Sequence, residues 1–180
     1  MLLMSRHTRG AVVENHNRGG ALVILILYMN TGTYEAPIWS AIGRRVEDSS
    51  MEYDWGKESS TDIFGATYSK YKPPVITQTF EPCDLDSGDT AQQKIWNQSI
   101  KDQDTGAMAN NDLLVVHAYA GAADTGVFAE RYPASAIEPT GLGGSANVGM
   151  PIEVTFGGER EVGTAAITET GVNFTKEGKE

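Results

Sequence analysis

Short apolar runs and alternating apolar and polar positions dominate this chain, and both patterns predict β-strands. Residues 21–29 (ALVILILYM) and 113–119 (LLVVHAY) are continuous apolar runs, typical of strands buried on both faces. Residues 75–80 (VITQTF) alternate, and within residues 148–156 the side chains of Ile152, Val154 and Phe156 share one face. Further strands are expected at residues 37–42, 46–53 (a polar edge strand), 127–136, 161–168 and 172–175.

One segment, residues 87–106 (SGDTAQQKIWNQSIKDQDTG), has helical spacing instead. Its apolar stripe comprises Ala91, Ile95, Trp96 and Ile100. Asp89 is expected to cap the first turn, Gln92 to complete a capping box from the polar face, and Gly106 to end the helix. A single helix with a narrow apolar stripe has to lie on a sheet, so the fold class is mainly β, a β-sandwich or partial barrel with one flanking α-helix.

The length and the distribution of charge indicate one domain with two charged ends. Residues 1–20 hold three arginines against one glutamate, a net charge of +2, which leaves −12 for the other 160 residues of a chain that counts −10. We expect residues 1–20 to be a flexible basic leader, residues 21–175 to be one β domain, and residues 176–180 to be a charged tail.

Charge and residue content restrict the chemistry. The chain counts −10 and its basic residues are not gathered on one face that could neutralise phosphates, which argues against direct readout of nucleic acid. Cys83 is the single cysteine, which excludes an intramolecular disulfide and a cysteine-based zinc site. Residues 84–89 (DLDSGD) imitate a calcium loop, but Asp89 stands where glycine is needed and Ile95 where the bidentate carboxylate belongs. A solvated acidic turn before the helix explains the same residues.

No constellation of catalytic residues is visible, so the chain is expected not to be an enzyme and to bind no cofactor or metal. His117 lies in an apolar strand, where a packed, hydrogen-bonded histidine is the expected state. The glycines of residues 141–144 complete no phosphate-binding fingerprint. A hydrolase would need a convergent acid pair such as Asp84 and Asp86, which lie in a turn.

Residues 54–71 form the segment that stands out from this pattern. Residues 54–60 (DWGKESS) are expected to be a loop, and residues 61–71 place Ile63, Phe64, Tyr68 and Tyr71 in a polar setting. Such exposed aromatic side chains either pack back on the domain as a hairpin or contact a partner.

Residues 29–43 (MNTGTYEAPIWSAIG) resemble the opening of the tail tube, or major tail, proteins of long-tailed bacteriophages. In that family a strand runs into N-T-G-T, then an acidic residue, proline and tryptophan, and a short strand that ends in glycine. The order of elements is similar over residues 21–175, including the polar strand and long loop before a K-P, the strand VITQTFEP and the helix after it. The motif itself covers only residues 29–43, and the family usually begins near the first strand.

The resemblance implies a structural virion protein with no enzymatic role. Six copies would close into a ring, inner sheets would join into a barrel, and rings would stack into a tube through which DNA passes without sequence-specific binding. Partners would be further copies and other tail proteins, such as the tape measure and the terminator, with no membrane. The protein would reside in the virion tail, and in the bacterial cytoplasm during assembly. The long loop would reach the adjacent ring, with Trp55, Phe64, Tyr68 and Tyr71 as the inter-ring contact.

A second hypothesis remains open. Residues 21–29 follow a basic start, as the apolar part of a signal peptide would, although no small-x-small cleavage site follows them. If this segment were a signal peptide, the protein would be a secreted β-sandwich binding module, which is the alternative to a buried strand and a tail tube subunit. The sequence does not select which strand faces would line a tube, because a shift of one residue in register reverses every face.

Overall fold

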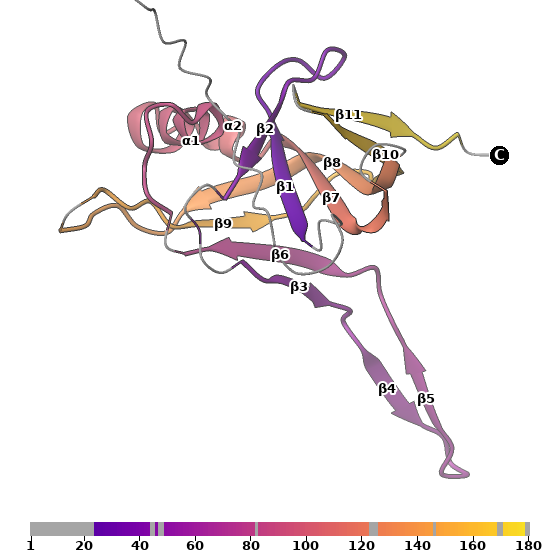
Figure 1. Ribbon diagram of the computed structural model, residues 1–180. Helices are drawn as coiled ribbons and strands as arrows, with labels where there is room; N and C mark the ends of the chain where they lie inside the picture. The colour runs from indigo at the N-terminus through magenta and orange to yellow at the C-terminus, as the bar shows by residue number, and fades with distance from the viewer. Residues whose placement is uncertain are drawn as a thin grey trace, which may run out of the picture.

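The computed structural model describes residues 24–43, 46, 49–81, 83–122, 126–145, 147–168 and 171–178. The expected leader at residues 1–20 and the start of the first strand at residues 21–23 lie outside the described residues. In the described part nine strands form one branched antiparallel sheet, in the order β2-β1-β7-β8-β9-β6-β3, with β10 paired to β8 and β11 paired to β10. The predicted mainly β fold with a flanking helix is therefore confirmed (Figure 1).

Most strands fall on predicted segments with shifted ends, but the strand expected at residues 46–53 begins only at Met51. Their bounds are β1 Leu25–Asn30, β2 Trp39–Ile42, β3 Met51–Asp54, β4 Glu58–Thr61, β5 Thr67–Lys70, β6 Val75–Phe80, β7 Asn111–Ala122, β8 Gly126–Pro139, β9 Ile152–Thr155, β10 Glu161–Thr168 and β11 Gly171–Lys176. The expected loop at residues 54–60 is wrong in part, because β4 begins at Glu58. It pairs with β5 in a separate two-stranded hairpin.

The sheet divides at β8, which is long enough to belong to two layers. Its first part, from Val127 to Arg131, pairs with β7 on one side and β10 on the other. Its last part, from Ala136 to Pro139, pairs with β9. Gly157 lets the chain pass close to the bend, since a β-carbon there would lie 2.5 Å from the Ala134 carbonyl oxygen. The layer β3-β6-β9-β8 thereby folds under the layer β2-β1-β7-β8.

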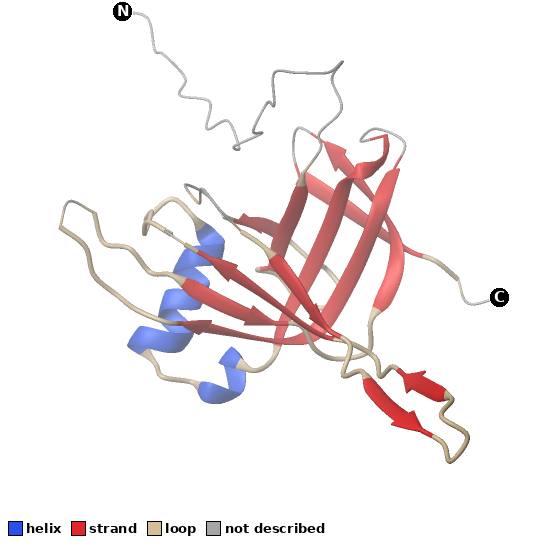
Figure 2. Cartoon of the chain, turned by 90° about the horizontal axis from the view of Figure 1, so that it is seen from below, coloured by secondary structure: helices blue, strands red, loops and turns tan. Residues whose placement is uncertain are grey.

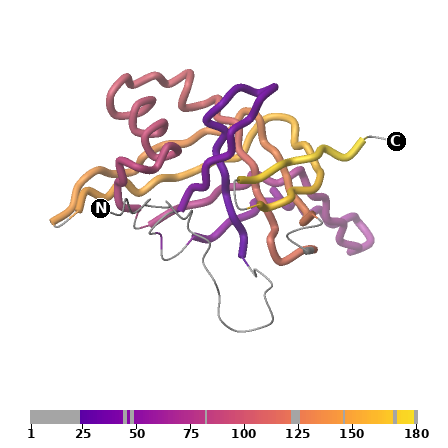
Figure 3. The backbone as a smooth tube through the Cα atoms, turned by 45° about the horizontal axis from the view of Figure 1, so that its top comes forward, coloured from indigo at the N-terminus to yellow at the C-terminus, as the bar shows by residue number. Residues whose placement is uncertain are grey.

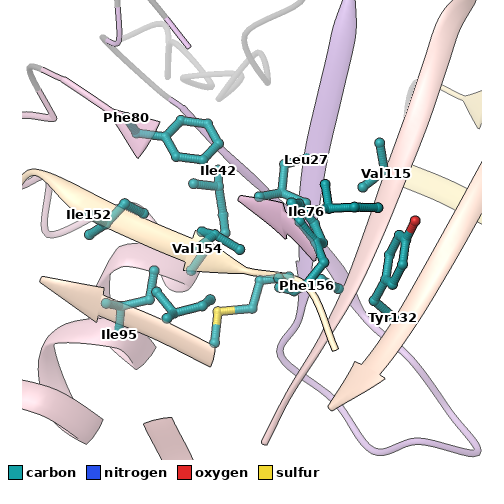
Figure 4. Packing of buried hydrophobic residues seen from close by; sticks show 14 of the residues in the cluster. Leu27, Ile42, Ile76, Phe80, Ile95, Val115, Tyr132, Ile152, Val154 and Phe156 are labelled. Atoms are coloured by element: carbon teal, nitrogen blue, oxygen red, sulfur yellow. The ribbon is translucent and has the colours of Figure 1, made fainter. Parts of the chain in front are cut away.

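The main core lies between these two layers and under the helix. It contains Leu27 and Val115 from the upper layer, Ile76 and Val154 from the lower layer, and Ile95 from the helix, all almost completely buried (Figure 4). The predicted shared face of Ile152, Val154 and Phe156 is buried here, as the alternation requires. Both apolar runs supply strands with two buried faces, because a second core covers the opposite side of β1 and β7.

That second core makes the upper layer a partial barrel. β10 and β11 curl over β1 and β7, and Ala165 and Val172 bury Leu114 and Val116 beneath them (Figure 1). Trp39 of β2 and Phe174 of β11 pack against the same cluster. β2 and β11 are the two unpaired margins of this curled layer, so the barrel is not closed by hydrogen bonds within the described residues.

The helical segment differs from the prediction in three respects. α1 spans Thr90–Trp96, a π-helical turn η1 follows at Asn97–Lys101, and a separate short helix α2 spans Thr105–Met108. Asp89 is the N-cap, as predicted, and its carboxylate accepts a hydrogen bond from the Gln92 amide. Gly106 does not end the helix but lies inside α2, and Gln103 with φ of +49° makes the turn instead.

The prediction that Gln92 lies on the polar, solvent-exposed face of the helix is wrong. It is 1% exposed, and its side chain accepts from the Asp86 amide and donates to the Asp84 carbonyl, at 2.8 and 2.9 Å. The predicted capping box is therefore incomplete. The Gln92 side chain binds the backbone of the segment before α1 and does not accept a hydrogen bond from the Asp89 amide. Ala91 and Ile95 are buried as predicted, whereas Ile100 is 37% exposed.

Candidate functional site

The lower layer presents one continuous acidic and hydroxylated face to solvent. Figure 1 shows β3, β6 and β9 along the underside of the molecule, and Figure 2 views the molecule from that side. Buried and outward side chains alternate along β6, β9 and the end of β8, and the register with β6 places Glu52 and Asp54 of β3 on the outward face. This acidic face consists of Glu52 and Asp54 of β3, Val75, Thr77 and Thr79 of β6, Glu153 and Thr155 of β9, and Ala136 and Glu138 of β8.

The strand register arranges these side chains in rows. One row runs Ala136, Thr155, Thr77 and Glu52, and a second runs Glu138, Glu153 and Thr79. The nine side chains of the acidic face include four carboxylates and no lysine, arginine or histidine. Small hydroxyl and acidic side chains give a flat surface that repels a polyanion.

The pair Glu138 and Glu153 is the most informative part of the acidic face. The two residues lie directly opposite each other on neighbouring strands. No described residue forms an ion pair with either carboxylate. Directly opposed like charges destabilise a sheet, so this arrangement works against the stability of the isolated chain. Locally unfavourable pairs of this kind are expected where a surface has a role other than folding.

Neutralising one member of this pair is expected to stabilise the subunit. Glu153→Gln removes the cross-strand repulsion with Glu138 while keeping the shape of the side chain, so the free energy of unfolding should rise by roughly 0.5 kcal/mol. Urea unfolding of the isolated protein measures it. Glu177→Gln, an exposed carboxylate after β11, is the control and should change nothing. A loss of stability in Glu153→Gln would contradict the assignment of repulsion.

An arm extends from one end of the lower layer. Residues 55–72 continue from β3 into β4, turn, and return through β5 to β6 (Figures 1 and 2). Every side chain of β4 and β5 is exposed. One face is a hydroxyl ladder, in which Ser59 pairs with Ser69 and Thr61 with Thr67 at 3.1 and 3.2 Å between oxygens. An isolated two-stranded hairpin is marginal in water, so the arm is a segment suited to a partner.

The tip of the arm is held in one conformation by Asp62. The carboxylate Oδ1 accepts hydrogen bonds from the amides of Phe64 and Ala66 at 2.8 and 2.9 Å, and Oδ2 accepts one from the Tyr68 hydroxyl at 3.1 Å. The hydrogen bond from the Ala66 amide contributes most to lowering the pKa of Asp62, and together with the bonds from Phe64 and Tyr68 it outweighs burial, which would raise that pKa. Ile63 and Phe64 are thereby presented to solvent at 93% and 89% exposure.

The four predicted contact residues lie along the whole arm and do not form one cluster. Trp55 stacks on Tyr53 at the root with ring centres 6.1 Å apart, and Tyr71 lies beside Lys57. Tyr68 is bound to the tip turn, and Phe64 is at the tip itself. Their role stays a prediction. Sequence reasoning did not include Ile63 in the contact, although an isoleucine in a polar turn is itself an indication.

The N-T-G-T motif has a structural role that the contacts explain. The buried Asn30 side chain accepts from the amides of Gly32 and Ile38 at 2.8 and 3.0 Å, and it donates to the Thr33 carbonyl and to Asp112. A β-carbon at Gly32 would lie 2.5 Å from the Ala36 carbonyl oxygen, so only glycine fits. The motif therefore folds the β1–β2 connection tightly back on the sheet.

A buried polar cluster lies on the inner face of β7 and β8. His117 contacts the Tyr119 hydroxyl through Nδ1 and the Glu130 carboxylate through Nε2, both at 2.7 Å, which confirms the predicted hydrogen-bonded histidine. Arg160 forms an ion pair with the other carboxylate oxygen. Burial alone raises the pKa of Glu130, but His117 and Arg160 together outweigh burial and hold the pKa below its usual value.

This lowered pKa predicts a loss of stability in acid. Glu130 binds a proton more readily in the unfolded chain than in the folded one, so its contribution is present above the unfolded pKa and disappears as the pH falls through the folded pKa. Urea unfolding from pH 6 down to about pH 3 should show a smaller acid dependence for Glu130→Gln than for the natural protein. Glu177→Gln should retain the full dependence, and an unchanged slope in Glu130→Gln would contradict the assignment.

Neither a metal cluster nor a membrane span stands out in the part of the chain that the structure describes. No three side chains of His, Cys, Asp and Glu converge there to hold an ion. Asp84 and Asp86 lie in the turn before α1, where Asp84 Oδ2 accepts from the Asn147 side chain and Asp86 Oδ1 from the Gly88 amide. The helices of the same residues are too short or too polar to cross a bilayer.

Comparison with known proteins gives similarity of fold only. No protein-family model matches the chain, and no curated protein matches it. A chain of the PVC sheath–tube complex, an extracellular contractile injection system in the extended state, shares 13% identity at a TM-score of 0.47, covering 89% of this chain and 99% of that one.

Two further solved structures are similar at the same level. The sheath/tube terminator of the same injection system in the extended state shares 11% identity at a TM-score of 0.46, over 82% of this chain and 98% of that one. The tube-terminating cap of the anti-feeding prophage shares 11% identity at a TM-score of 0.42, over 87% and 100%. At these values the likeness concerns the course of the backbone and assigns this chain no function.

Proposed function

We propose that this protein is a structural subunit of a phage-type tail tube, in which copies close into rings, six to a ring, and rings stack around a channel for DNA. The single observation that carries the proposal is the acidic face, which spans four strands, bears four carboxylates and no basic side chain, and belongs to a layer with open margins. The resemblance of residues 29–43 to tail tube proteins supports the same function.

The open margins give a route to a ring. β3 is the last strand of the lower layer, and among the described residues the end of β8 beyond Ser135 has a strand partner only in β9. Unpaired strand margins are avoided in proteins that remain monomeric. Pairing the β3 margin of one copy with the β8 margin of the next is a head-to-tail contact, and such contacts close into rings when the rotation fits. The acidic faces would then line one continuous inner wall.

The remaining partners follow from this function as proposals. DNA would pass the inner wall without specific binding, because carboxylates repel phosphates at short range. Other tail proteins, the tape measure and the terminator, would meet the channel and the end of the tube. The protein would act in the virion tail after assembly in the bacterial cytoplasm. The competing hypothesis of a secreted binding module depends on residues 21–29 as a signal segment, and the basic start before that segment, residues 1–20, lies outside the described residues.

Electron microscopy of the purified protein tests the proposal. Negative-stain images at increasing protein concentration should show rings and tubes with a central channel. Size-exclusion chromatography with light scattering measures the mass of the smallest closed species, which should correspond to six copies. A sample that stays monomeric at every concentration would overturn the proposal. N-terminal sequencing of protein recovered from a producing cell distinguishes the secreted module, because a signal peptidase would remove the first residues.

Reversing the charge of the acidic face should make the channel retain DNA. The double variant Glu138→Lys, Glu153→Lys places two ammonium groups on each copy at the proposed inner wall, where they attract phosphates. Tubes of the variant should bind short double-stranded DNA in a manner that weakens steeply with salt, whereas natural tubes should not. Glu35→Lys with Glu177→Lys adds the same charge at exposed positions away from the face and is the control. Equal retention by both variants would exclude the acidic face as the channel wall.

A further inference from the structure

A preformed groove lies at the end of the molecule opposite the arm. It has a volume of about 870 Å³ and lies between α1 and the β8–β9 connection. Leu85, Trp96, Leu142 and Val148 supply its apolar walls, with Asn97 and Asn147 at its polar rim. Leu142 and Val148 are each 50% exposed, although both are large and apolar. Pockets of this size and apolar character are typical binding sites.

Hydrogen bonds hold the two walls of the groove together. The Leu85 amide donates to the Val148 carbonyl at 2.8 Å, and the Met150 amide donates to the Cys83 carbonyl at 2.7 Å. Within the β8–β9 connection the amide and carbonyl groups of Gly143 and Gly149 bond each other at 3.0 and 2.7 Å. The groove is therefore formed before anything binds, which lowers the entropy cost of docking.

The strand directions place the arm and the groove at opposite ends of one layer. The strands β3, β6, β9 and the end of β8 are antiparallel neighbours. The arm follows the last residue of β3, at one end of this layer. The β8–β9 connection lies at the other end of the layer, where β3 begins. Figures 1, 2 and 3 all show the arm on one side of the molecule, with α1 and the β8–β9 connection on the other. An arm therefore cannot reach the groove of its own chain, but copies stacked along the strand direction bring each arm to the groove of the next copy.

We infer that the arm tip of one copy, Ile63 with Phe64, inserts into the groove of the copy in the adjacent ring. This rests on the proposed function and names the receiving surface of the arm. The tip carries the two most exposed of the large apolar side chains in the described residues, and the groove offers apolar walls of matching chemistry. Charge adds a smaller contribution. Residues 81–89 beside the groove hold four carboxylates and no basic residue, whereas residues 55–72 of the arm hold three lysines against two carboxylates, a net charge of +1.

The area of the contact explains why it needs a ring. Burying an exposed phenylalanine removes roughly 150–250 Å² of its surface from water, so one docked tip with its groove buries on the order of several hundred Å². Stable pairs of proteins bury about 1,200 Å² or more. The area buried by a single docked tip is therefore too small to hold two copies together. Between two rings six tips can dock at once, and each docked tip raises the effective concentration of the others, so the two rings bind far more tightly than two single copies. The subunit should thus be monomeric when dilute and stack only as rings.

Disulfide trapping tests the inference. In the double variant Phe64→Cys, Leu142→Cys every copy offers one thiol at its tip and one in its groove, so oxidation of assembled tubes should link copies into a ladder far beyond a dimer on non-reducing gels. The native Cys83 is buried, and burial raises the pKa of its thiol, so it should not contribute. Either single variant should give dimers at most. Phe64→Cys, Asn173→Cys, with the second thiol on exposed β11, is the matched control and should give no ladder.

The outcomes separate this inference from the proposed function. Tubes that give a ladder only with the Phe64 and Leu142 pair support the docking. Tubes that form normally but give no ladder, or give one equally with Asn173→Cys, overturn the docking and leave the tube assignment standing. Protein that forms neither rings nor tubes before any substitution overturns both. As a second readout, Leu142→Asp should abolish stacking to the same extent as Phe64→Asp while the folded monomer keeps its unfolding midpoint, and normal stacking in either would count against the docking.

Discussion

Shortening the arm is expected to leave a folded subunit that forms rings but no longer stacks. The clean change replaces residues 60–68 by Asn-Gly, because Ser59 and Ser69 lie directly opposite each other and Asn-Gly closes a two-residue hairpin. The side chains of β4 and β5 are exposed and add nothing to either core, so the free energy of unfolding should change by less than about 0.5 kcal/mol. Electron microscopy should show single rings in place of tubes.

The matched control keeps the length and the tip of the arm. Ser59→Ala with Ser69→Ala removes one exposed hydroxyl pair of the ladder and retains Ile63, Phe64 and the Asp62 turn. Its tubes should be normal. Tubes of ordinary length and stability in the shortened variant would show that the arm has no part in stacking, whereas loss of rings as well would place the arm in the contact within a ring.

The periodicity of the sequence predicted most of the fold, because a strand face is determined by short-range alternation. Buried residues at every second position of β6 and β9 follow directly from the pattern. The fork at β8 could not be predicted in this way. A 14-residue strand looks like any long strand, and only the partners on its two sides show that it belongs to two layers.

The helix shows how tertiary contacts override local signals. The sequence places Gln92 among polar neighbours on a solvent face, but the segment before α1 has partly buried backbone groups at Asp84 and Asp86, and the side-chain amide of Gln92 forms hydrogen bonds with them. The predicted single helix also does not allow for the π-turn at Asn97–Lys101, where the i to i+5 bond from the Asp102 amide to the Asn97 carbonyl moves Ile100 out of the apolar stripe.

The candidate site was only partly accessible from the sequence. The aromatic content of residues 54–71 identified the arm, because apolar side chains in a polar segment are visible without a structure. The acidic face was not visible in that way. Its four carboxylates are spread over 102 positions of the chain, from Glu52 to Glu153, and only the register brings Glu138 opposite Glu153. The groove has the same origin, since the segments around Leu85 and Val148 meet through long-range hydrogen bonds.

Breaking the ion pair between Arg131 and Asp112 is expected to cause the largest loss of stability. The Arg131 side chain donates from Nε and Nη2 to the two carboxylate oxygens at 2.8 and 2.6 Å, and both side chains are about nine-tenths buried. The guanidinium also donates to the Tyr34 carbonyl at 3.0 Å and lies 4.0 Å from the centre of the Tyr34 ring. It therefore fastens the β1–β2 connection, which holds the N-T-G-T motif, to the sheet.

In Arg131→Met the Asp112 carboxylate stays buried with only the Asn30 amide as a described donor, so the free energy of unfolding should fall by roughly 3 kcal/mol. Arg131→Lys keeps the charge but loses the two-pronged geometry, and it should give an intermediate loss. Lys72→Met removes a solvent-exposed ion pair with Glu58 and should cost less than about 1 kcal/mol. Urea unfolding of the three variants measures these values. If Arg131→Met were no more damaging than Lys72→Met, the β1–β2 connection would not depend on Arg131, and the N-T-G-T motif would need no support from this ion pair between β7 and β8.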